Sequence, residues 1–162
     1  MSAAVRPVPE GYHTVTPAIT CRGAAGAIEF YKKAFGAKEI SRMEAPGGMI
    51  AHAEIQIGDS RIMLGDEWPG KSAAPSATAL PSTNLFLYLP EVDKVFNAAV
   101  AAGCQAEMPP MDMFWGDRYG KVRDPYGHHW GLATHIEDVS MEEMKRRSAE
   151  FMAQMAKGAG QS

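Results

Sequence analysis

The chain has 162 residues, of which 46% are hydrophobic and 22% charged, so it can bury one compact core or two half-domains that share one. Its net charge of -3 gives no reason to expect nucleic acid or an anionic membrane as a partner. It contains no apolar run of about 18 residues, the length of a membrane span. Cys21 and Cys104 form no C-x-x-C pair, which argues against a disulfide scaffold and a cysteine zinc site. A reducing cytoplasm is the simplest location.

The first half of the chain is predicted to form a strand, a helix and three more strands. Alternating side chains predict the first strand over residues 14–21. Apolar residues at helical spacing predict a helix over residues 23–35, and Gly36 is placed to end it. The strands that follow are predicted over residues 37–43, 49–57 and 60–64. In the second of these, the odd-numbered residues form the apolar side.

The same order of elements is predicted again after a linker that is rich in Pro, Ala and Ser, residues 67–82. The predicted elements are a strand over 84–89, a helix over 91–102, and strands over 104–108, 114–122 and 128–134, with Pro109-Pro110 as a break. We therefore expect an α+β protein of two βαβββ modules, residues 13–66 and 83–135, whose curved mixed sheets form a cleft.

The remaining segment, residues 136–162, is predicted to be a helical tail. Ser140 and Glu143 have the spacing of a capping box, and a stripe of mostly apolar residues follows. Such a helix needs an apolar surface to cover, which could belong to its own module or to a second subunit.

Several segments resemble one known family. Residues 27–37, AIEFYKKAFGA, look like the first-helix signature of the vicinal oxygen chelate (glyoxalase/bleomycin resistance/dioxygenase) superfamily. The segment FWGDRYG, residues 114–120, followed by DPYGHHW, residues 124–130, is similar to the PhnB-like branch, as is the ending over residues 135–147. The resemblance covers residues 13–147. It implies paired βαβββ modules with outer helices, a small-molecule cleft and, as in many members, a homodimer.

The enzymes of this family hold a divalent metal on the inner sheet face through His, Gln and Glu. The resemblance places the ligand positions at Thr16, at or next to Asn84, and at Gly131. Thr is a poor ligand, Asn a modest one, and Gly has no side chain. We therefore expect the usual metal triad to be absent and predict no cofactor, with a small-molecule binder as the leading function.

The alternative is an enzyme with a substitute divalent-metal site. Strand alternation puts His52, Glu54 and His129 on the cleft side, and such a trio could hold zinc or iron. The protein would then be a metal-dependent lyase, isomerase or dioxygenase. His128 could not join His129 on one ion within a strand, because neighbouring side chains point to opposite faces.

The other candidates are predicted to bind a ligand directly. Trp115 would give a flat apolar wall, and Arg118 would pair with an anionic group. Equally, Trp115 could belong to the core and Arg118 could stabilise a loop or an interface. The sequence identifies no catalytic residue. The predicted ligand-binding set is Thr16, His52, Glu54, Asn84, Phe86, Tyr88, Trp115, Arg118 and His129.

Overall fold

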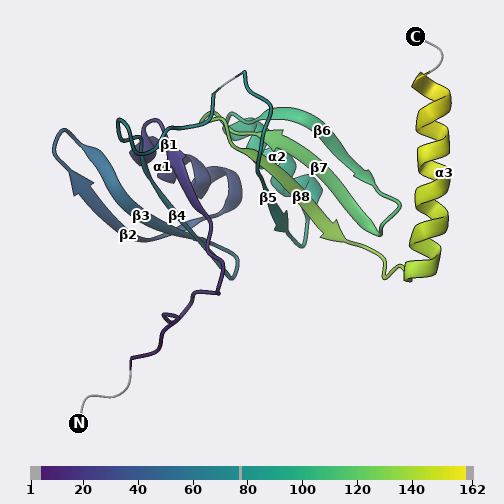
Figure 1. The fold of residues 1–162 in the computed structure, drawn as a ribbon, viewed down its shortest axis with the longest axis horizontal. Coiled ribbons are helices and arrows are strands. Elements are labelled where there is room, and N and C mark those ends of the chain that lie inside the picture. Colours follow the sequence, from purple (N-terminus) through teal and green to yellow (C-terminus); the bar gives the residue numbers. More distant parts are fainter. Residues whose placement is uncertain (1–4, 77, 160–162) are drawn as a thin grey trace.

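The protein folds into two four-stranded sheets and three helices, as seen in a computed structural model that describes residues 5–76 and 78–159 (Figure 1). The first sheet and its helix comprise β1 (Ala18–Cys21), α1 (Ala24–Phe35), β2 (Lys38–Ala45), β3 (Met49–Ile57) and β4 (Ser60–Asp66). The second comprise β5 (Asn84–Tyr88), α2 (Val92–Ala102), β6 (Gln105–Asp112), β7 (Asp117–Arg123) and β8 (His129–His135). The chain continues into α3 (Met141–Ala159).

The two sheets have the same topology. Their strand orders are β1-β4-β3-β2 and β5-β8-β7-β6. In each sheet the first strand runs parallel to its neighbour and the other pairs are antiparallel, so both sheets are mixed. This arrangement confirms the α+β fold of two four-stranded modules with a C-terminal helix. None of the described helices has the length and apolar character to cross a membrane.

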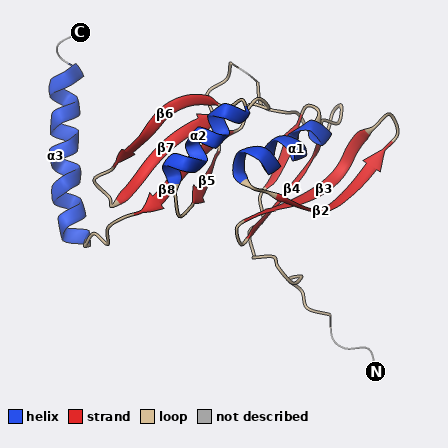
Figure 2. Cartoon of the chain, turned by 180° about the vertical axis from the view of Figure 1, so that it is seen from behind, coloured by secondary structure: helices blue, strands red, loops and turns tan. Residues whose placement is uncertain are grey.

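Helices cover only one side of the sheets. α1 and α2 lie next to each other on that side, whereas α3 stands apart beside the second sheet (Figures 1 and 2). The core therefore forms between the sheets and this helix pair, where Tyr31, Ile55, Trp130 and Leu132 are fully buried. We call the opposite, helix-free side of the two sheets the inner face.

Asp66, at the end of β4, fixes the start of α1. The residue before the helix is Gly23, which has no side chain with which to cap it. The Asp66 carboxylate instead accepts hydrogen bonds from the backbone N–H groups of Gly23 and Ala24, at 2.9 and 2.8 Å. It thereby satisfies donors that the first turn of a helix leaves free, and it joins the helix to the sheet.

Three predicted strand limits are wrong. β1 begins at Ala18 rather than at residue 14, and Val15 is 83% exposed. β6 continues through Pro109 and Pro110, where a break was predicted. Proline is tolerated there because β6 is an edge strand whose register shifts at this point. β7 begins at Asp117 rather than at residue 114.

The predicted alternation of β3 fails at its beginning. His52 pairs with Met43 and Ile50 pairs with Glu44, so Ala51 is an extra residue in the ladder. Because of this bulge, the residues before Ala51 face the side opposite to the predicted one. Ile50 is therefore buried in the core instead of lying on the same face as His52. His52 and Glu54 remain together on the inner face, as predicted.

Candidate functional site

Four aromatic side chains lie together on the inner face of the second sheet, and we call them the aromatic platform: Phe86, Tyr88, Trp115 and Tyr119. The rings of Phe86 and Tyr119 are nearly parallel, with centroids 5.3 Å apart and an interplanar angle of 6°. Tyr88 lies 5.0 Å from Phe86, and Trp115 lies 5.8 Å from Tyr119. Phe86 is 43% exposed and Tyr88 64% exposed, so the platform offers ring surface to a flat partner.

A buried carboxylate holds one side of the platform in place. Asp117 is only 2% exposed. It accepts hydrogen bonds from the Tyr88 hydroxyl at 3.0 Å and from the Trp115 indole N–H at 2.9 Å, and it contacts His135 Nδ1 at 2.8 Å. The hydrogen bond to Asp117 raises the pKa of Tyr88, because it stabilises the protonated phenol. The platform therefore has a fixed geometry before any ligand arrives.

Gly131 lies beneath the stacked pair, because β8 places it between Phe86 of β5 and Lys121 of β7. A Cβ atom at this position would come within 2.8 Å of Phe86 Cδ2 and 2.9 Å of Tyr119 Cε2. The two rings thus occupy the space that a longer side chain would need. The position at which the resemblance places a metal-binding carboxylate is here part of an aromatic surface.

His129 and Asn84 lie next to each other at the start of the same face. His129 Nδ1 is 2.9 Å from Glu107 Oε2, and the imidazole is almost completely buried. Since a carboxylate accepts hydrogen bonds, we infer that Nδ1 carries the proton and that Nε2 keeps its lone pair.

The inner face of the first sheet carries a polar cluster around Glu54. Its carboxylate accepts a short hydrogen bond from the Tyr12 hydroxyl, and its other oxygen lies 3.3 Å from His52 Nε2. Arg61 lies 3.7 Å from the carboxylate and stacks over the Tyr12 ring, 4.5 Å from its centroid. The hydrogen bond from Tyr12, followed by that from His52, lowers the pKa of Glu54, so Glu54 is an anion at neutral pH.

Arg118 is separated from the other predicted ligand-binding residues. Successive residues of β7 face opposite sides, so Tyr119 belongs to the inner face and Arg118 to the side of α2. Its guanidinium forms a bidentate pair with Asp93 of α2, at 2.6 and 2.8 Å, and contacts Asp112 at 2.9 Å. Arg118 therefore joins α2 to the second sheet and does not reach the platform.

The residues at the family's metal positions do not fit a divalent ion. Thr16 lies before β1 and contacts the carbonyl of His13, Asn84 offers one weak oxygen, and Gly131 offers none. The substitute trio does not gather into a site either: His52 contacts Glu54, whereas His129 contacts Glu107. Over residues 5–76 and 78–159, no three His, Cys, Asp or Glu side chains gather closely enough to hold an ion.

Both cysteines are free and buried. Burial, followed by the charge of Asp124, raises the pKa of Cys21 to about 12, and the same two causes raise that of Cys104 to about 12. Because only the thiolate is a good nucleophile, neither cysteine is suited to covalent catalysis at neutral pH.

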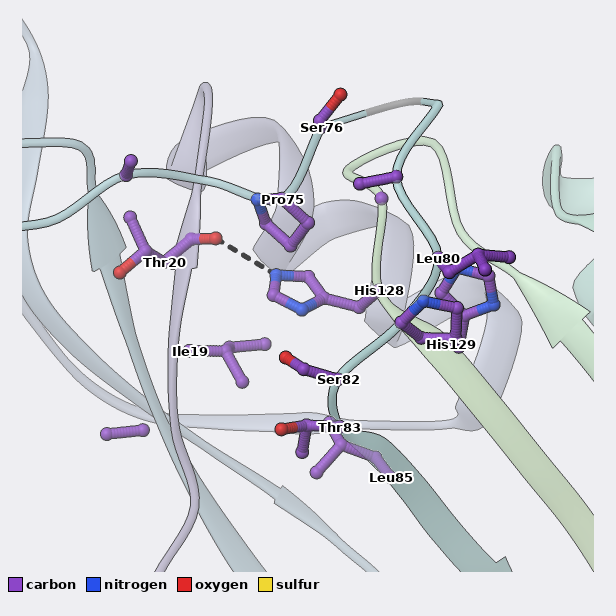
Figure 3. Close-up of a pocket in the computed structure, with 15 residues that line it drawn as sticks. Ile19, Thr20, Pro75, Ser76, Leu80, Ser82, Thr83, Leu85, His128 and His129 are labelled. Atoms are coloured by element: carbon purple, nitrogen blue, oxygen red, sulfur yellow. Dashed lines mark hydrogen bonds between the residues drawn. The ribbon is translucent and has the colours of Figure 1, made fainter.

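A pocket of about 440 Å³ lies under the linker, between β1 and the turn that leads into β8 (Figure 3). Its walls include Thr20, Leu80 and Ser82, and both His128 and His129 line it. His128 precedes β8 and is not part of the strand, so strand alternation does not force the two imidazoles apart. Both histidines can therefore line one pocket.

Two matching sheets, with paired helices on one side and a helix-free inner face on the other, define a duplicated α+β protein of the paired βαβββ class. The sequence profile of the Glyoxalase/Bleomycin resistance protein/Dioxygenase superfamily matches residues 13–132. The chain belongs to this superfamily.

Relatives and solved structures agree with this assignment. An uncharacterized protein of Mycobacterium tuberculosis is 38% identical over 135 residues, which cover 81% of this chain and 79% of that protein. Protein YjdN of Escherichia coli is 32% identical over 115 residues, which cover 65% of this chain and 76% of that protein. The crystal structure of TioX from Micromonospora superposes with a TM-score of 0.60 at 25% identity. The match covers 80% of this chain and 99% of TioX. A PhnB protein from Bacillus cereus has a TM-score of 0.61 at 21% identity, covering 75% and 99%, which supports the fold.

The sequence groups Tyr119 with Trp115 and Arg118, but the glycines around Tyr119 leave the face of its strand ambiguous, so it was not in the predicted ligand-binding set. The register of β7 with β8 places it on the inner face. Sequence reasoning missed two other residues of the site. Glu107 lies at a register shift in β6, where alternation gives no guide. Tyr12 belongs to the arm before β1, and no pattern connects it with Glu54, which is 42 residues away.

Proposed function

We propose that the protein binds a small aromatic molecule on its inner face, without the metal that the enzymes of the superfamily use. The observation that carries this proposal is the stacked pair of Phe86 and Tyr119 above Gly131, where the resemblance expects a metal ligand. Aromatic walls with a few fixed polar groups are typical of small-molecule sites. Here Asp117, which accepts hydrogen bonds from the Tyr88 hydroxyl and the Trp115 indole, supplies the polar group beside the rings.

A second copy of the chain is proposed to close the cleft. In a single chain the inner face leaves large side chains in solvent, among them Tyr88, Met43 and Met111. Exposed apolar patches of this kind typically mark an interface or a ligand groove. Sedimentation equilibrium should find a dimer. Tyr88→Glu should shift the protein toward monomer, because the dimer would have to bury the new charge.

The binding proposal can be tested with the fluorescent aromatic anion 8-anilinonaphthalene-1-sulfonate as the probe. Phe86→Ala and Tyr119→Ala should each weaken its binding about tenfold, since removal of a stacked ring costs roughly 1.4 kcal/mol. Trp68→Ala is the matched control, because this ring is also partly exposed, at 38%, but belongs to the linker and not to the platform. Equal affinity in all variants would rule out the platform as the binding surface.

The metal-dependent alternative is tested by elemental analysis of protein purified without chelators. The proposal expects substoichiometric Zn, Fe, Mn and Ni, together with full binding of the probe. Stoichiometric metal that is lost in His52→Ala would instead support a lyase, isomerase or dioxygenase.

The two free, buried thiols fit a reducing cytoplasm as the location.

A further inference from the structure

We propose that the pocket under the linker is a second binding site, for an uncharged molecule with an apolar body and hydroxyl or N–H donors. It would accept those donors with Nδ1 of His128 and Nε2 of His129. No residue of the aromatic platform lines this pocket, although both sites lie near β5. The inference goes beyond the proposed function, which concerns the platform.

The pocket has the size and position of a small-ligand site. Its volume of about 440 Å³ falls in the range of roughly 300–1,000 Å³ that such sites occupy. It lies where three separate segments meet, namely β1, the linker and the turn before β8 (Figure 3). Pro75 of the linker packs closely on this turn. A Cβ atom added to Gly127 would lie only 3.1 Å from Pro75 Cβ.

The backbone of β1 determines which ring nitrogen of His128 carries the proton. Its Nε2 lies 2.9 Å from the carbonyl oxygen of Thr20 (Figure 3). Cys21 Sγ lies 3.8 Å from the same nitrogen. A carbonyl oxygen can only accept, so we infer that Nε2 carries the proton. In the neutral ring Nδ1 is then an acceptor, and it has no hydrogen-bond partner among the residues that the structure describes.

Glu107 fixes the proton of His129 in the same way. Its carboxylate accepts a hydrogen bond from Nδ1–H of the buried imidazole at 2.9 Å, and in the neutral ring Nε2 is then an acceptor. Within the described part of the chain this nitrogen also lacks a partner. Two adjacent histidines therefore line one pocket, each with one ring nitrogen bonded to a protein acceptor and the other without a partner among the described residues.

The rest of the lining determines the class of ligand. It contains hydroxyl groups, including those of Ser82 and Thr83, and apolar side chains, including Ile19 and Leu85, but no Asp, Glu, Lys or Arg among the described residues. A charged ligand would therefore lose its hydration without gaining an opposite charge. Two imidazoles are also too few for a stable metal site. A neutral alcohol or amide with an apolar body matches both parts of the lining.

The test uses cyclohexanol as the probe, because it carries one hydroxyl donor and has no ring to stack on the platform. In the wild-type protein with ¹⁵N-labelled histidine, cyclohexanol should shift the resonance of at least one of the two nitrogens, His128 Nδ1 or His129 Nε2, in a saturable way, because its single hydroxyl donates to one nitrogen at a time. Cyclohexyl methyl ether, which has no donor, and cyclohexanecarboxylate, which is an anion, should leave them unchanged. Shifts with the ether or the carboxylate equal to those with cyclohexanol would overturn the assigned ligand chemistry.

A pair of matched variants completes the test. His129→Phe should weaken cyclohexanol binding at least fivefold, and His13→Phe, the same change outside the pocket, should leave it unchanged. The platform variant Phe86→Ala should weaken the naphthalene sulfonate probe and not cyclohexanol. If the probe binds the platform but cyclohexanol leaves both imidazoles unshifted, this inference fails while the proposed function stands. The wild-type titration remains decisive even if His129→Phe does not fold.

Discussion

At the scale of single residues, one glycine decides what the inner face can do. Gly131 offers no donor, and its missing side chain makes room for Phe86 and Tyr119 to stack across β8. The lack of a metal-coordinating side chain at Gly131 and the stacking of the two rings therefore have the same structural cause. A substitution at this position tests both.

Gly131→Ala should destabilise the protein by about 1–3 kcal/mol, because the new methyl group overpacks against two rings. Urea unfolding measures this change. In a Phe86→Ala background the same substitution should cost much less, since the ring that it strikes has been removed. An equal cost in both backgrounds would show that the rings do not limit this position.

At the scale of elements, His135 links the end of β8 to the segment that leads into α3. Its Nδ1 lies 2.8 Å from Asp117 of β7, and its Nε2 lies 2.9 Å from Asp138. Only the protonated imidazole can donate from both nitrogens at once. The hydrogen bond to Asp138, followed by that to Asp117, raises the pKa of His135 above its ordinary value of 6.5.

The stability of this link should depend on pH. A pKa that is raised on folding gives stability that is fully present below the unfolded value of 6.5 and is lost as the pH rises through the folded value. NMR titration of His135 should therefore give a midpoint above 6.5, and Asp138→Asn should lower that midpoint. A midpoint at or below 6.5 in the wild type would contradict the double contact.

At the scale of the whole molecule, a buried carboxylate joins the two halves of the chain. Asp124 accepts hydrogen bonds from the Tyr31 hydroxyl of α1 at 2.7 Å and from the Trp130 indole of β8 at 2.8 Å. Its second oxygen accepts from the backbone N–H groups of Tyr126 and His128, both at 2.9 Å. The Tyr31 and Trp130 rings also pack together, with centroids 5.4 Å apart. The halves thus share one core.

Unfolding should consequently be a single cooperative transition. Tyr31→Phe should lower the free energy of unfolding by about 1–3 kcal/mol, since the change removes a buried hydrogen bond to a charged group. Circular dichroism, which averages both halves, and tryptophan fluorescence, which reports Trp68, Trp115 and Trp130, should give coincident curves. Tyr126→Phe is the control, because that hydroxyl bonds to no described residue. Two separate transitions would show that the halves fold independently.

The sequence by itself determined the duplicated order of elements, and the resemblance to the family, which rests on single side chains, implied outer helices and poor metal ligands at Gly131 and Thr16. These features depend on local periodicity, turn residues and the identity of single side chains, all of which can be read along the chain. The aromatic character of Phe86 and Tyr88 was visible for the same reason, because β5 alternates regularly.

Only the tertiary structure decided which side chains meet. The bulge at Ala51, the edge position that tolerates Pro109 and the register that turns Arg118 toward α2 all depend on neighbouring strands. The contacts of Glu107 with His129 and of Thr20 with His128 join residues that are 22 and 108 positions apart. Local patterns hold no record of such contacts, because the packing of the whole chain brings these residues together.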